Sequence, residues 1–359
     1  MRHLELFAGI GGFRRALDLL SKDKVMQFEC VGYSEIDKAA TKTYKANFKP
    51  AEDEVEMGDI VEFTSNPRKM ASLPHFDLLT GGFPCQTFSM MGKQEGFNED
   101  RGQMFFRILD IIDARNPRYI LLENVKNLFT HNKGETFRTI KSKLEERGYN
   151  VVFDIFNTSD FHLPQTRNRV IIFATLDPLP DNYREIFTSK NVAKVFESKF
   201  ADSSVSTYET TLDVLSKDVD GKYFLSEKIK PTILADGSAN FKSNSEINLL
   251  VARPLTATMH KMHRACQDNY FSQDFIESGG KYNPVKECTK EELASHKIRK
   301  ITPAEAFMLQ GFPEEFALKG KESGVGDGAL YRQAGNAVSV NTIYAVLYFL
   351  IQDKKIVEI

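Results

Sequence analysis

A cysteine follows a predicted strand at the point where the strand gives way to a glycine-rich loop. The apolar run at residues 76–80 is followed by Gly81-Gly82-Phe83-Pro84-Cys85-Gln86, so Cys85 comes after a diglycine turn and a proline. A thiolate is a strong nucleophile, and a polar loop displays it to a substrate. We therefore predict that Cys85 is a nucleophile. A small buried hydrophobe is the alternative that its residue type alone favours.

A carboxylate and two arginines accompany other predicted strands. Glu123 directly follows the apolar run 119–122, where partial burial would raise its pKa and let it donate a hydrogen bond near neutral pH. Arg167 and Arg169, at the start of a strand predicted over 169–174, would lie on one face and could bind a phosphate or a base carbonyl. The alternatives are a surface glutamate that opens a helix and a pair of solvated charges at a sheet edge.

Signals for a bound nucleoside cluster near the start of the chain. The run Phe7-Ala8-Gly9-Ile10-Gly11-Gly12 joins a predicted strand to a helix, where missing side chains let a ligand approach the backbone. Arg14 stands at the third glycine of the dinucleotide pattern, which disfavours a pyrophosphate cradle. Glu35 lies 24 residues beyond Gly11, near the spacing at which a carboxylate reaches ribose hydroxyls. Asp37 is expected only to cap the next helix.

The order of predicted elements places these residues along one edge of a sheet. Up to about residue 176, short apolar runs alternate with amphipathic stretches, which indicates an α/β fold with a doubly wound, mostly parallel, Rossmann-like sheet. Ligands of such folds bind at the carboxyl ends of the strands, where Asp59 supplies a second acidic loop. The strands are predicted at residues 3–7, 30–34, 54–57, 76–80, 119–122, 150–156 and 169–174, and the clearest helices at 37–47, 103–114 and 135–147.

Two further helices are predicted towards the C-terminus. Residues 302–310 carry a capping box, with Thr302 as N-cap and Glu305 three residues later. Residues 336–352 are apolar enough to be a core helix. Gly335 and Asn336 would open this helix and leave free amides for a ligand.

Composition sets limits on the class of protein. The 359 residues allow two domains, and the formal net charge of −2 means that any surface for nucleic acid must be local. The 4 scattered cysteines offer neither a disulfide framework nor Cys-x-x-Cys zinc spacing, so no metal site is expected. No apolar run reaches the ~20 residues that cross a bilayer, and no signal-peptide pattern opens the sequence, so we expect a cytoplasmic protein without membrane contact.

Several motifs, taken in order, resemble those of the DNA (cytosine-5) methyltransferase family. The most specific are Pro84-Cys85-Gln86, Glu123-Asn124-Val125 and Gln165-x-Arg167-x-Arg169. The resemblance also rests on Phe7-Ala8-Gly9-Ile10-Gly11-Gly12, Glu35-Ile36-Asp37, Gly58-Asp59-Ile60, Arg101-Gly102, Leu309-Gln310-Gly311-Phe312-Pro313 and Gly335-Asn336-x-Val338. The resemblance does not cover about residues 179–299, where the sequence becomes charge-rich and its hydrophobic pattern is weakly periodic. In this family the corresponding region is the variable target-recognition region.

The resemblance implies an architecture and a reaction. Residues 1–178, completed by 330–359, would form a methyltransferase domain that binds S-adenosylmethionine and releases S-adenosylhomocysteine. Residues 179–329 would form a smaller inserted target-recognition domain. The enzyme would methylate C5 of a cytosine flipped out of a specific short double-stranded DNA sequence. We expect a monomer that is the modification enzyme of a restriction-modification system, with a possible cognate endonuclease acting on the same site.

The resemblance also assigns roles to matched positions. Cys85 would add to cytosine C6, Glu123 would hold N3 and the 4-amino group, Arg169 would contact O2, and Arg167 would support the loop or the DNA backbone. The DNA side of the site would include Gln86, Ser89 and Gln165. The cofactor pocket would include Phe7, Gly9, Gly11, Glu35, Ile36, Asp59, Ile60, Pro84, Met104, Asn336 and Val338.

The sequence departs from the family pattern at three places. Ile36 stands where an aromatic residue often meets the adenine, and Ala304 replaces the arginine that usually precedes Glu305. Pro254 takes the threonine slot of the turn that supports DNA phosphates, so Thr256 is not assigned to it.

Two alternatives remain open at this stage: a transfer-RNA cytosine-5 methyltransferase, and a DNA-binding module that has lost catalysis. Basic residues that could line a DNA cleft are Lys261, His263, Arg264, Lys281, Lys286, Lys297, Arg299 and Lys300. A run of such charges is more often a solvated surface.

Overall fold

The structure is a computed structural model that describes residues 1–84, 104–238 and 241–357. The chain forms two compact units. Unit 1 comprises Met1–Asn157, Asn168–Val205 and Val338–Ile359, and unit 2 comprises Thr158–Arg167 and Ser206–Ala337. Residues 179–205 thus group with the sheet, and residues 158–167 and 330–337 group with unit 2, which differs from the boundaries predicted above.

Unit 1 is built on a seven-stranded sheet with the order β3-β2-β1-β4-β5-β7-β6. All strands are parallel except β7, which runs antiparallel to both of its neighbours. This is the mostly parallel α/β sheet that the sequence predicts. The strands are β1 (Arg2–Leu6), β2 (Glu29–Tyr33), β3 (Val55–Glu56), β4 (Leu78–Gly82), β5 (Tyr119–Val125), β6 (Asn150–Asn157) and β7 (Asn168–Thr175).

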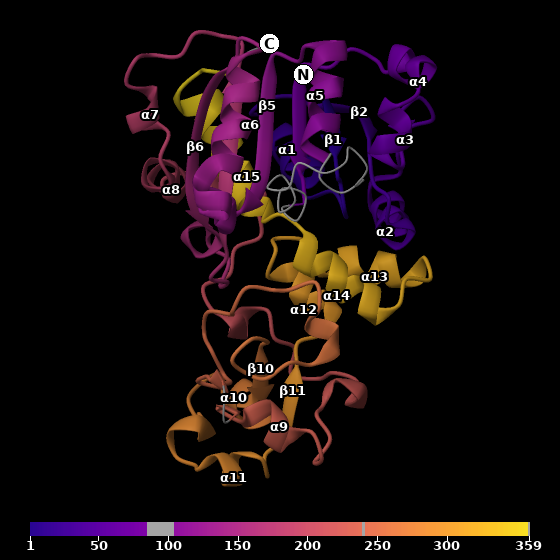
Figure 1. Cartoon of the computed structure of the whole chain (residues 1–359). Coiled ribbons are helices and arrows are strands. Elements are labelled where there is room, and N and C mark those ends of the chain that lie inside the picture. Colours follow the sequence, from indigo (N-terminus) through magenta and orange to yellow (C-terminus); the bar gives the residue numbers. More distant parts are fainter. Residues whose placement is uncertain (85–103, 239–240, 358–359) are drawn as a thin grey trace. The chain divides into compact units, whose positions relative to one another are not determined.

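Helices cover both faces of the sheet (Figure 1). They are α1 (Gly12–Lys22), α2 (Lys38–Phe48), α3 (Ile60–Thr64), α4 (Pro67–Ser72), α5 (Met104–Arg115), α6 (Glu135–Glu145), α7 (Tyr183–Ile186), α8 (Ser189–Glu197) and α15 (Val340–Tyr348). Buried side chains of α3, α5 and α6 pack with alternate residues of the central strands in one apolar cluster. Helices α1, α8 and α15 pack together on the other face.

Aspartate side chains cap the N-termini of α2 and α3 and so define where these helices begin. Asp37 caps α2 and accepts hydrogen bonds from the amides of Ala39 and Ala40, as predicted for a helix cap. Asp59 caps α3 in the same way through Val61. Each acidic loop after a strand therefore starts the following helix.

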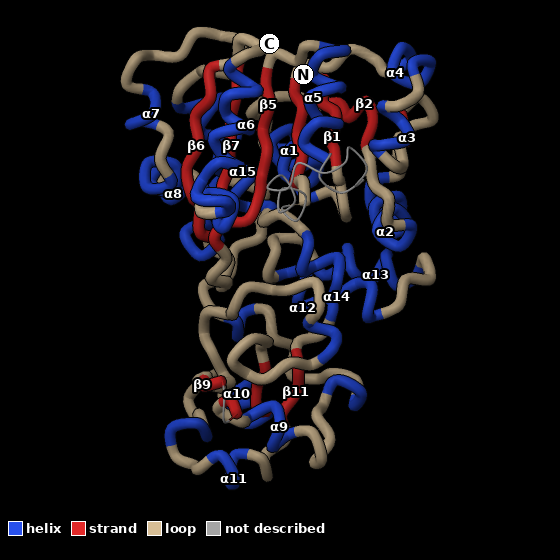
Figure 2. The backbone as a smooth tube through the Cα atoms, viewed as in Figure 1, coloured by secondary structure: helices blue, strands red, loops and turns tan. Residues whose placement is uncertain are grey.

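Unit 2 has short elements and much irregular chain (Figure 2). Its strands are β8 (Gly237–Ser238), β9 (Phe241–Lys242), β10 (Tyr270–Ser272) and β11 (Ile298–Lys300). Its helices are α9 (Lys230–Leu234), α10 (Gln273–Glu277), α11 (Lys290–Leu293), α12 (Pro303–Met308), α13 (Glu314–Glu322) and α14 (Asp327–Asn336). The capping box predicted at Thr302 and Glu305 is present at the start of α12.

The helix predicted over 336–352 is present from Val340 onwards, and only its predicted start was wrong. Asn336 ends α14 instead of opening a helix, and α15 begins at Val340 because Ala337 and Ser339 have extended backbone. Together the two helices, Asp327–Asp353, are long and apolar enough to cross a membrane by length and composition alone. However, 89% of the most apolar window is buried within the protein, as in a core helix.

Candidate active site

The ends of neighbouring strands bring two predicted catalytic residues together in unit 1. Glu123 on β5 lies opposite Gly82 of β4 and Ile171 of β7 in the strand register. Arg169 precedes Ile171 by two residues and therefore shares its face of the sheet. Its Nε lies 2.9 Å from Glu123 Oε1, and the two side chains are 19% and 12% exposed. The ion pair is largely but not wholly shielded from solvent.

Strand β4 leads from this pair towards Cys85. Phe83 is buried, and its carbonyl accepts a hydrogen bond from Asn124 Nδ2 at 2.8 Å, which ties the end of β4 to β5. Pro84 is exposed and is the last described residue before the gap. Cys85, Gln86 and Ser89 lie outside the described residues. Because Gly82 pairs with Glu123, the chain leaves β4 beside the carboxylate.

Val338 lies against the same group of residues. A Cβ on Gly12 would be 2.4 Å from Val338 Cγ2, so only glycine permits this approach. A Cβ on Gly82 would be 3.5 Å from both Val338 Cγ1 and Glu123 Oε2. Val338 therefore packs between the start of α1 and the end of β4, next to Glu123.

The two glycines of the first turn have different surroundings. Gly9 has φ +57°, and a Cβ there would meet nothing within 4 Å, so the backbone faces open space. At Gly11, by contrast, a Cβ would lie 2.2 Å from the Phe48 ring. The space beside Gly11 is thus filled by an aromatic side chain of α2, and only Gly9 offers the open approach to a ligand that the sequence predicts.

Glu35 connects the first turn to the end of β2. Its Oε2 accepts from the Gly9 amide and its Oε1 from the Asp37 amide, both at 2.7 Å. Burial raises the pKa of the Glu35 carboxyl, against the effect of these amides. The neighbouring Ile36 is 71% exposed. A carboxylate and an exposed apolar side chain therefore stand side by side at the open turn.

The other predicted pocket residues are distributed over both units. Asp59 caps α3, Ile60 is buried, and Met104, the first residue of α5, packs on the apolar cluster. Asn336 is exposed at the end of α14 in unit 2.

The sequence analysis did not predict two buried polar side chains on β1. Glu5 and His3 alternate with leucines on β1, a period-two signal that could have revealed them. Burial raises the pKa of Glu5 to about 8 and lowers that of His3 to about 3. Arg14 opposes the shift at Glu5 and bonds to Tyr44 Oη at 2.9 Å and Glu54 Oε1 at 2.5 Å. Arg14, which replaces the third glycine of the dinucleotide pattern, therefore connects α1 to Tyr44 and Glu54 through largely buried hydrogen bonds.

Gln165 and Arg167 do not form a common clamp with Arg169. Gln165 is fully buried: its Nε2 donates to the Leu309 carbonyl, and its Oε1 accepts from the Leu255 amide, both at 2.9 Å. This geometry does not favour the predicted DNA contact, because both ends of the amide are used inside unit 2. Arg167, 1% exposed, donates to the carbonyls of Leu255, Gly335 and Ala337 at 2.8–3.1 Å.

These contacts hold the base of a segment that carries one exposed cation, Lys261. A Cβ on Gly335 would lie 2.3 Å from the Thr256 carbonyl carbon, so the backbone at 256–257 packs directly on α14. Lys261 and Met262 are exposed at the far part of this segment, and Met262 has a left-handed backbone. His263 is held by Asp268, which accepts from its amide at 2.8 Å and from its Nδ1 at 3.1 Å. We call residues 256–264 the basic loop.

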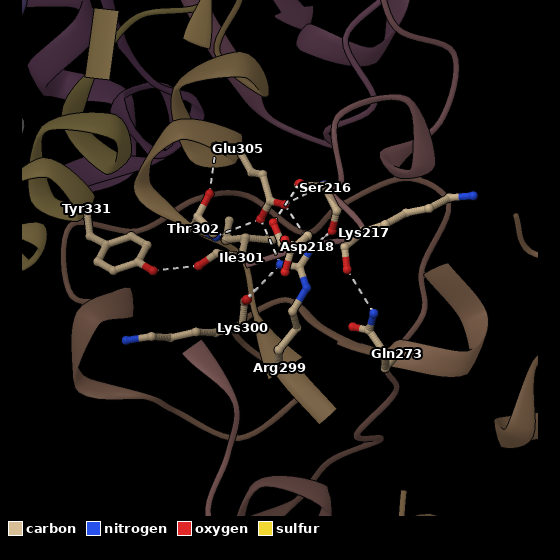
Figure 3. Close-up of polar contacts among 10 residues, drawn as sticks. All are labelled: Ser216, Lys217, Asp218, Gln273, Arg299, Lys300, Ile301, Thr302, Glu305 and Tyr331. Carbon is tan, nitrogen blue, oxygen red and sulfur yellow. Dashed lines mark hydrogen bonds and ion pairs between the residues drawn. The ribbon is translucent and has the colours of Figure 1, made fainter. Parts of the chain in front are cut away.

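Arg299 is not a cleft residue, which corrects its place among the basic residues predicted above. It is fully buried and forms a bidentate pair with Glu305, with both N···O distances at 2.8 Å (Figure 3). The carboxylate also accepts from the amides of Ser216 and Thr302. Arg299 on β11 is thus the charge partner of Glu305. The residue before Glu305 is Ala304, where the family usually has an arginine.

Comparison with known proteins identifies the chain. The family described as C-5 cytosine-specific DNA methylase matches residues 1–352. The chain belongs to this family. As a DNA (cytosine-5) methyltransferase it acts on DNA, the substrate in the family's description, rather than on the RNA considered above.

Relatives and solved structures agree with this membership. The Type II methyltransferase M1.ScrFI of Lactococcus lactis subsp. cremoris is 38% identical over 96% of this chain and 76% of its own length. M.BanI of Aneurinibacillus aneurinilyticus is 31% identical over 98% and 96%. The crystal structure of S. pombe Dnmt2 methyltransferase, 22% identical, has a TM-score of 0.75 over 99% of both chains and shows the shared fold.

Proposed function

We propose that this methyltransferase moves a methyl group from S-adenosylmethionine to C5 of a cytosine that is flipped out of a specific short duplex sequence. The observation that carries the mechanism is the Glu123–Arg169 pair, 2.9 Å apart at the strand ends where β4 leads to Cys85. A nucleophile, an acid and a hydrogen-bond donor converging on one ring are what this chemistry requires.

The residues of unit 1 fit the cofactor. The open space at Gly9, the carboxylate of Glu35 and the exposed Ile36 match a ribose beside an apolar adenine face. In this proposal Glu35 accepts from the ribose hydroxyls and Ile36 contacts the adenine, while Asp59 and Ile60 border the base. Bound S-adenosylmethionine supplies an electrophilic methyl group. The further members of the pocket in unit 1 are Phe7, Pro84, Met104 and Val338.

The chain's own residues then prepare the cytosine. The Cys85 thiolate adds to C6 while Glu123 holds N3 and the 4-amino group, which makes C5 nucleophilic enough to take a methyl group. Arg169 contacts O2 and orients Glu123. A solvent water then takes the C5 proton, and the C5–C6 double bond re-forms as the C6–S bond breaks and releases the Cys85 thiolate. The base must leave the helix first, because neither ring face at C6 is open in stacked DNA.

Unit 2 would recognise the DNA target. Its basic loop is held at the base by Arg167 and Gly335 and carries Lys261 and His263 further along. A rigid base with an exposed cation suits both phosphate contacts and base readout. Gln165 and Arg167 are then positioning residues for this loop. We further propose that Gln86 and Ser89 contribute contacts to DNA.

The naming of the relatives supports a biological context. Type II methyltransferases are modification enzymes of restriction-modification systems, and several relatives carry that name. We infer that this enzyme protects a cognate site from an endonuclease, and that it works as a cytoplasmic monomer.

A covalent trap tests the mechanism. Bisulfite sequencing of plasmid from cells that express the enzyme would first identify the methylated sequence. Duplexes with 5-fluorocytosine at that target, incubated with S-adenosylmethionine, should then yield a denaturation-resistant adduct, because fluorine cannot leave as the C5 proton does. The adduct should be absent in Cys85→Ala. An adduct or wild-type turnover in that variant would remove Cys85 from the mechanism.

A further inference from the structure

A thiol, an imidazole and a carboxylate form a chain of contacts in unit 2, apart from the proposed methyltransferase site. Cys288 Sγ lies 3.8 Å from His296 Nε2, and His296 Nδ1 lies 2.7 Å from Asp274 Oδ2. With Nδ1 protonated and donating to the carboxylate, Nε2 presents a lone pair to the thiol. This is the arrangement of a nucleophile, a base and a residue that orients the base.

We propose that Cys288 is a reactive thiol, a site of covalent modification by peroxides and other small electrophiles, with His296 as its base and Asp274 as the orienting residue. The proposal does not depend on the methyl-transfer mechanism.

The backbone holds the three residues in place from separate segments. Strands β10 and β11 pair with Ser272 opposite Ile298, and the Gln273 amide donates to the Lys297 carbonyl at 2.8 Å. This ladder sets Asp274 and His296 across from each other. Cys288 follows a 3-10 turn, and its amide donates to the Pro284 carbonyl at 2.9 Å.

A buried amide connects the cysteine segment to the same ladder. Asn248 Nδ2 donates to Ser272 Oγ at 3.0 Å and to Asn283 Oδ1 at 2.9 Å. Asn248 is itself only 4% exposed. The distance from Cys288 to His296 is therefore set by paired backbone and buried hydrogen bonds, not by the side chains alone.

The thiol is open to small reagents only. Cys288 is partly exposed and packs on the apolar cluster of unit 2, and the His296 side chain is 21% exposed. The phenol of Tyr282 is within electrostatic range of Cys288, Glu287 and Asp274, and His296 is the base in contact with the thiol.

The geometry does not suit a metal ion. His296 bridges the other two groups through its two ring nitrogens, so Cys288 and Asp274 are on opposite sides of the ring and cannot share one centre. Among the residues that the structure describes, no group of three or more His, Cys, Asp or Glu side chains is placed to hold a metal.

The modification by a peroxide balances as follows. The Cys288 proton moves to His296 Nε2, and the thiolate sulfur attacks one peroxide oxygen. The O–O bond breaks as the S–O bond forms, and the leaving alkoxide or hydroxide takes the proton from the imidazolium. Sulfur is oxidised by two electrons to a sulfenic acid, and the peroxide is reduced to an alcohol or water.

Peptide-resolved alkylation with iodoacetamide tests the reactivity. Cys266 serves as the control, because it is also partly exposed in unit 2, and among the described residues it forms no hydrogen bond with a histidine, although Arg253 is within electrostatic range of it. We expect Cys288 to react roughly tenfold or more faster than Cys266 in the folded enzyme, with the two rates equal in guanidinium, because only the folded chain places a histidine base against the Cys288 thiol. His296→Asn keeps a donor for Asp274 but removes the base, and should bring the Cys288 rate down to that of Cys266.

The same variants answer the peroxide question. After brief exposure to hydrogen peroxide, a dimedone probe should label the Cys288 peptide in the wild type, weakly in His296→Asn and not at all in Cys288→Ser. An unchanged Cys266 rate shows that the variants are folded. Equal alkylation of Cys288 and Cys266, no loss of rate in His296→Asn, or no dimedone label at Cys288 would each overturn the proposal. The covalent DNA trap reports separately on Cys85.

Discussion

Arginine side chains in the two units differ in what surrounds them. In unit 1, Arg169 is 19% exposed and pairs with one carboxylate at the end of a sheet. In unit 2, Arg167 and Arg299 are among the largest fully buried side chains, and each bonds to backbone carbonyls of distant segments. The sheet positions the first through strand register, whereas the other two hold irregular chain together.

The contrast follows from how each unit is built. Seven strands and their helices bury a continuous apolar cluster, so unit 1 can leave polar groups at its strand ends for chemistry. Unit 2 has strands of two or three residues and a small apolar cluster, so buried hydrogen bonds must connect its segments. Changes at the strand ends should therefore affect activity, and changes to the buried ties of unit 2 should affect stability.

The largest expected effect tests the strand ends. Glu123→Gln removes the acid but keeps the side-chain shape, and should slow methyl transfer by about 10²–10⁴-fold, as is typical for general acid catalysis. Because Glu123 and Arg169 form a largely buried ion pair, the substitution should also lower the free energy of unfolding in urea, by about 1–3 kcal/mol. Glu52→Gln, at an exposed position, is the control for both measurements. If Glu123→Gln lost stability but kept full activity, Glu123 would have a structural role and not a catalytic one.

The buried pair of unit 2 should give the next largest effect, on stability. Arg299→Met leaves Glu305 as an unpaired buried charge and should cost about 3–5 kcal/mol in urea unfolding. The exposed pair Lys141 and Glu145 on α6 provides the contrast, because Lys141→Met should cost less than about 1 kcal/mol. Similar losses of unfolding free energy at both pairs would show that the buried Arg299–Glu305 pair is no more important for stability than an exposed pair.

The cofactor edge should respond in affinity. Glu35→Ala should weaken S-adenosylmethionine binding by roughly 1.5–3 kcal/mol, about 10- to 150-fold, because a charge-assisted hydrogen bond is lost. Isothermal titration calorimetry measures the change. Asp37→Asn, in the same loop, preserves the cap of α2 and should leave the affinity unchanged. If Glu35→Ala binds S-adenosylmethionine as tightly as the wild type does, Glu35 only connects the backbone amides of Gly9 and Asp37.

The smallest effect concerns the interior of unit 1. Because burial raises the pKa of Glu5 from 4.5 to about 8, the folded chain keeps a proton that the unfolded chain has lost between these values. Stability should therefore fall as pH rises through this window, by up to about 1.4 kcal/mol per pH unit.

Denaturant titrations at pH 7 and 8 measure this slope, and Glu5→Gln should remove most of it. The window avoids most of the effect of His3, whose lowered pKa costs stability only as pH falls through about 6.5. The same slope in the variant would assign the pH dependence to other groups.

Much of unit 1 could be predicted because its signals are local. All seven predicted strands are present, although β3 has only two residues, β4 lies two residues later than predicted, and β5 extends to Val125 where the prediction ended at residue 122. The helix cap at Asp37 depends only on residues two or three positions away. The start predicted for the last helix, at residue 336, was wrong because the extended backbone at Ala337 and Ser339 is not marked by glycine or proline.

The sequence by itself determined the family, the α/β sheet and the order in which reactive residue types follow the strands, because motifs and periodicity are read along the chain. Only the tertiary structure decided which charged residues stay available for chemistry. Gln165, Arg167 and Arg169 belong to one motif, yet two are buried ties of unit 2 and one pairs with Glu123 in unit 1. The contacts of Gln165 and Arg167 reach residues 88–170 positions away. Burial and pairing at such separations depend on how distant segments pack, which no local pattern records.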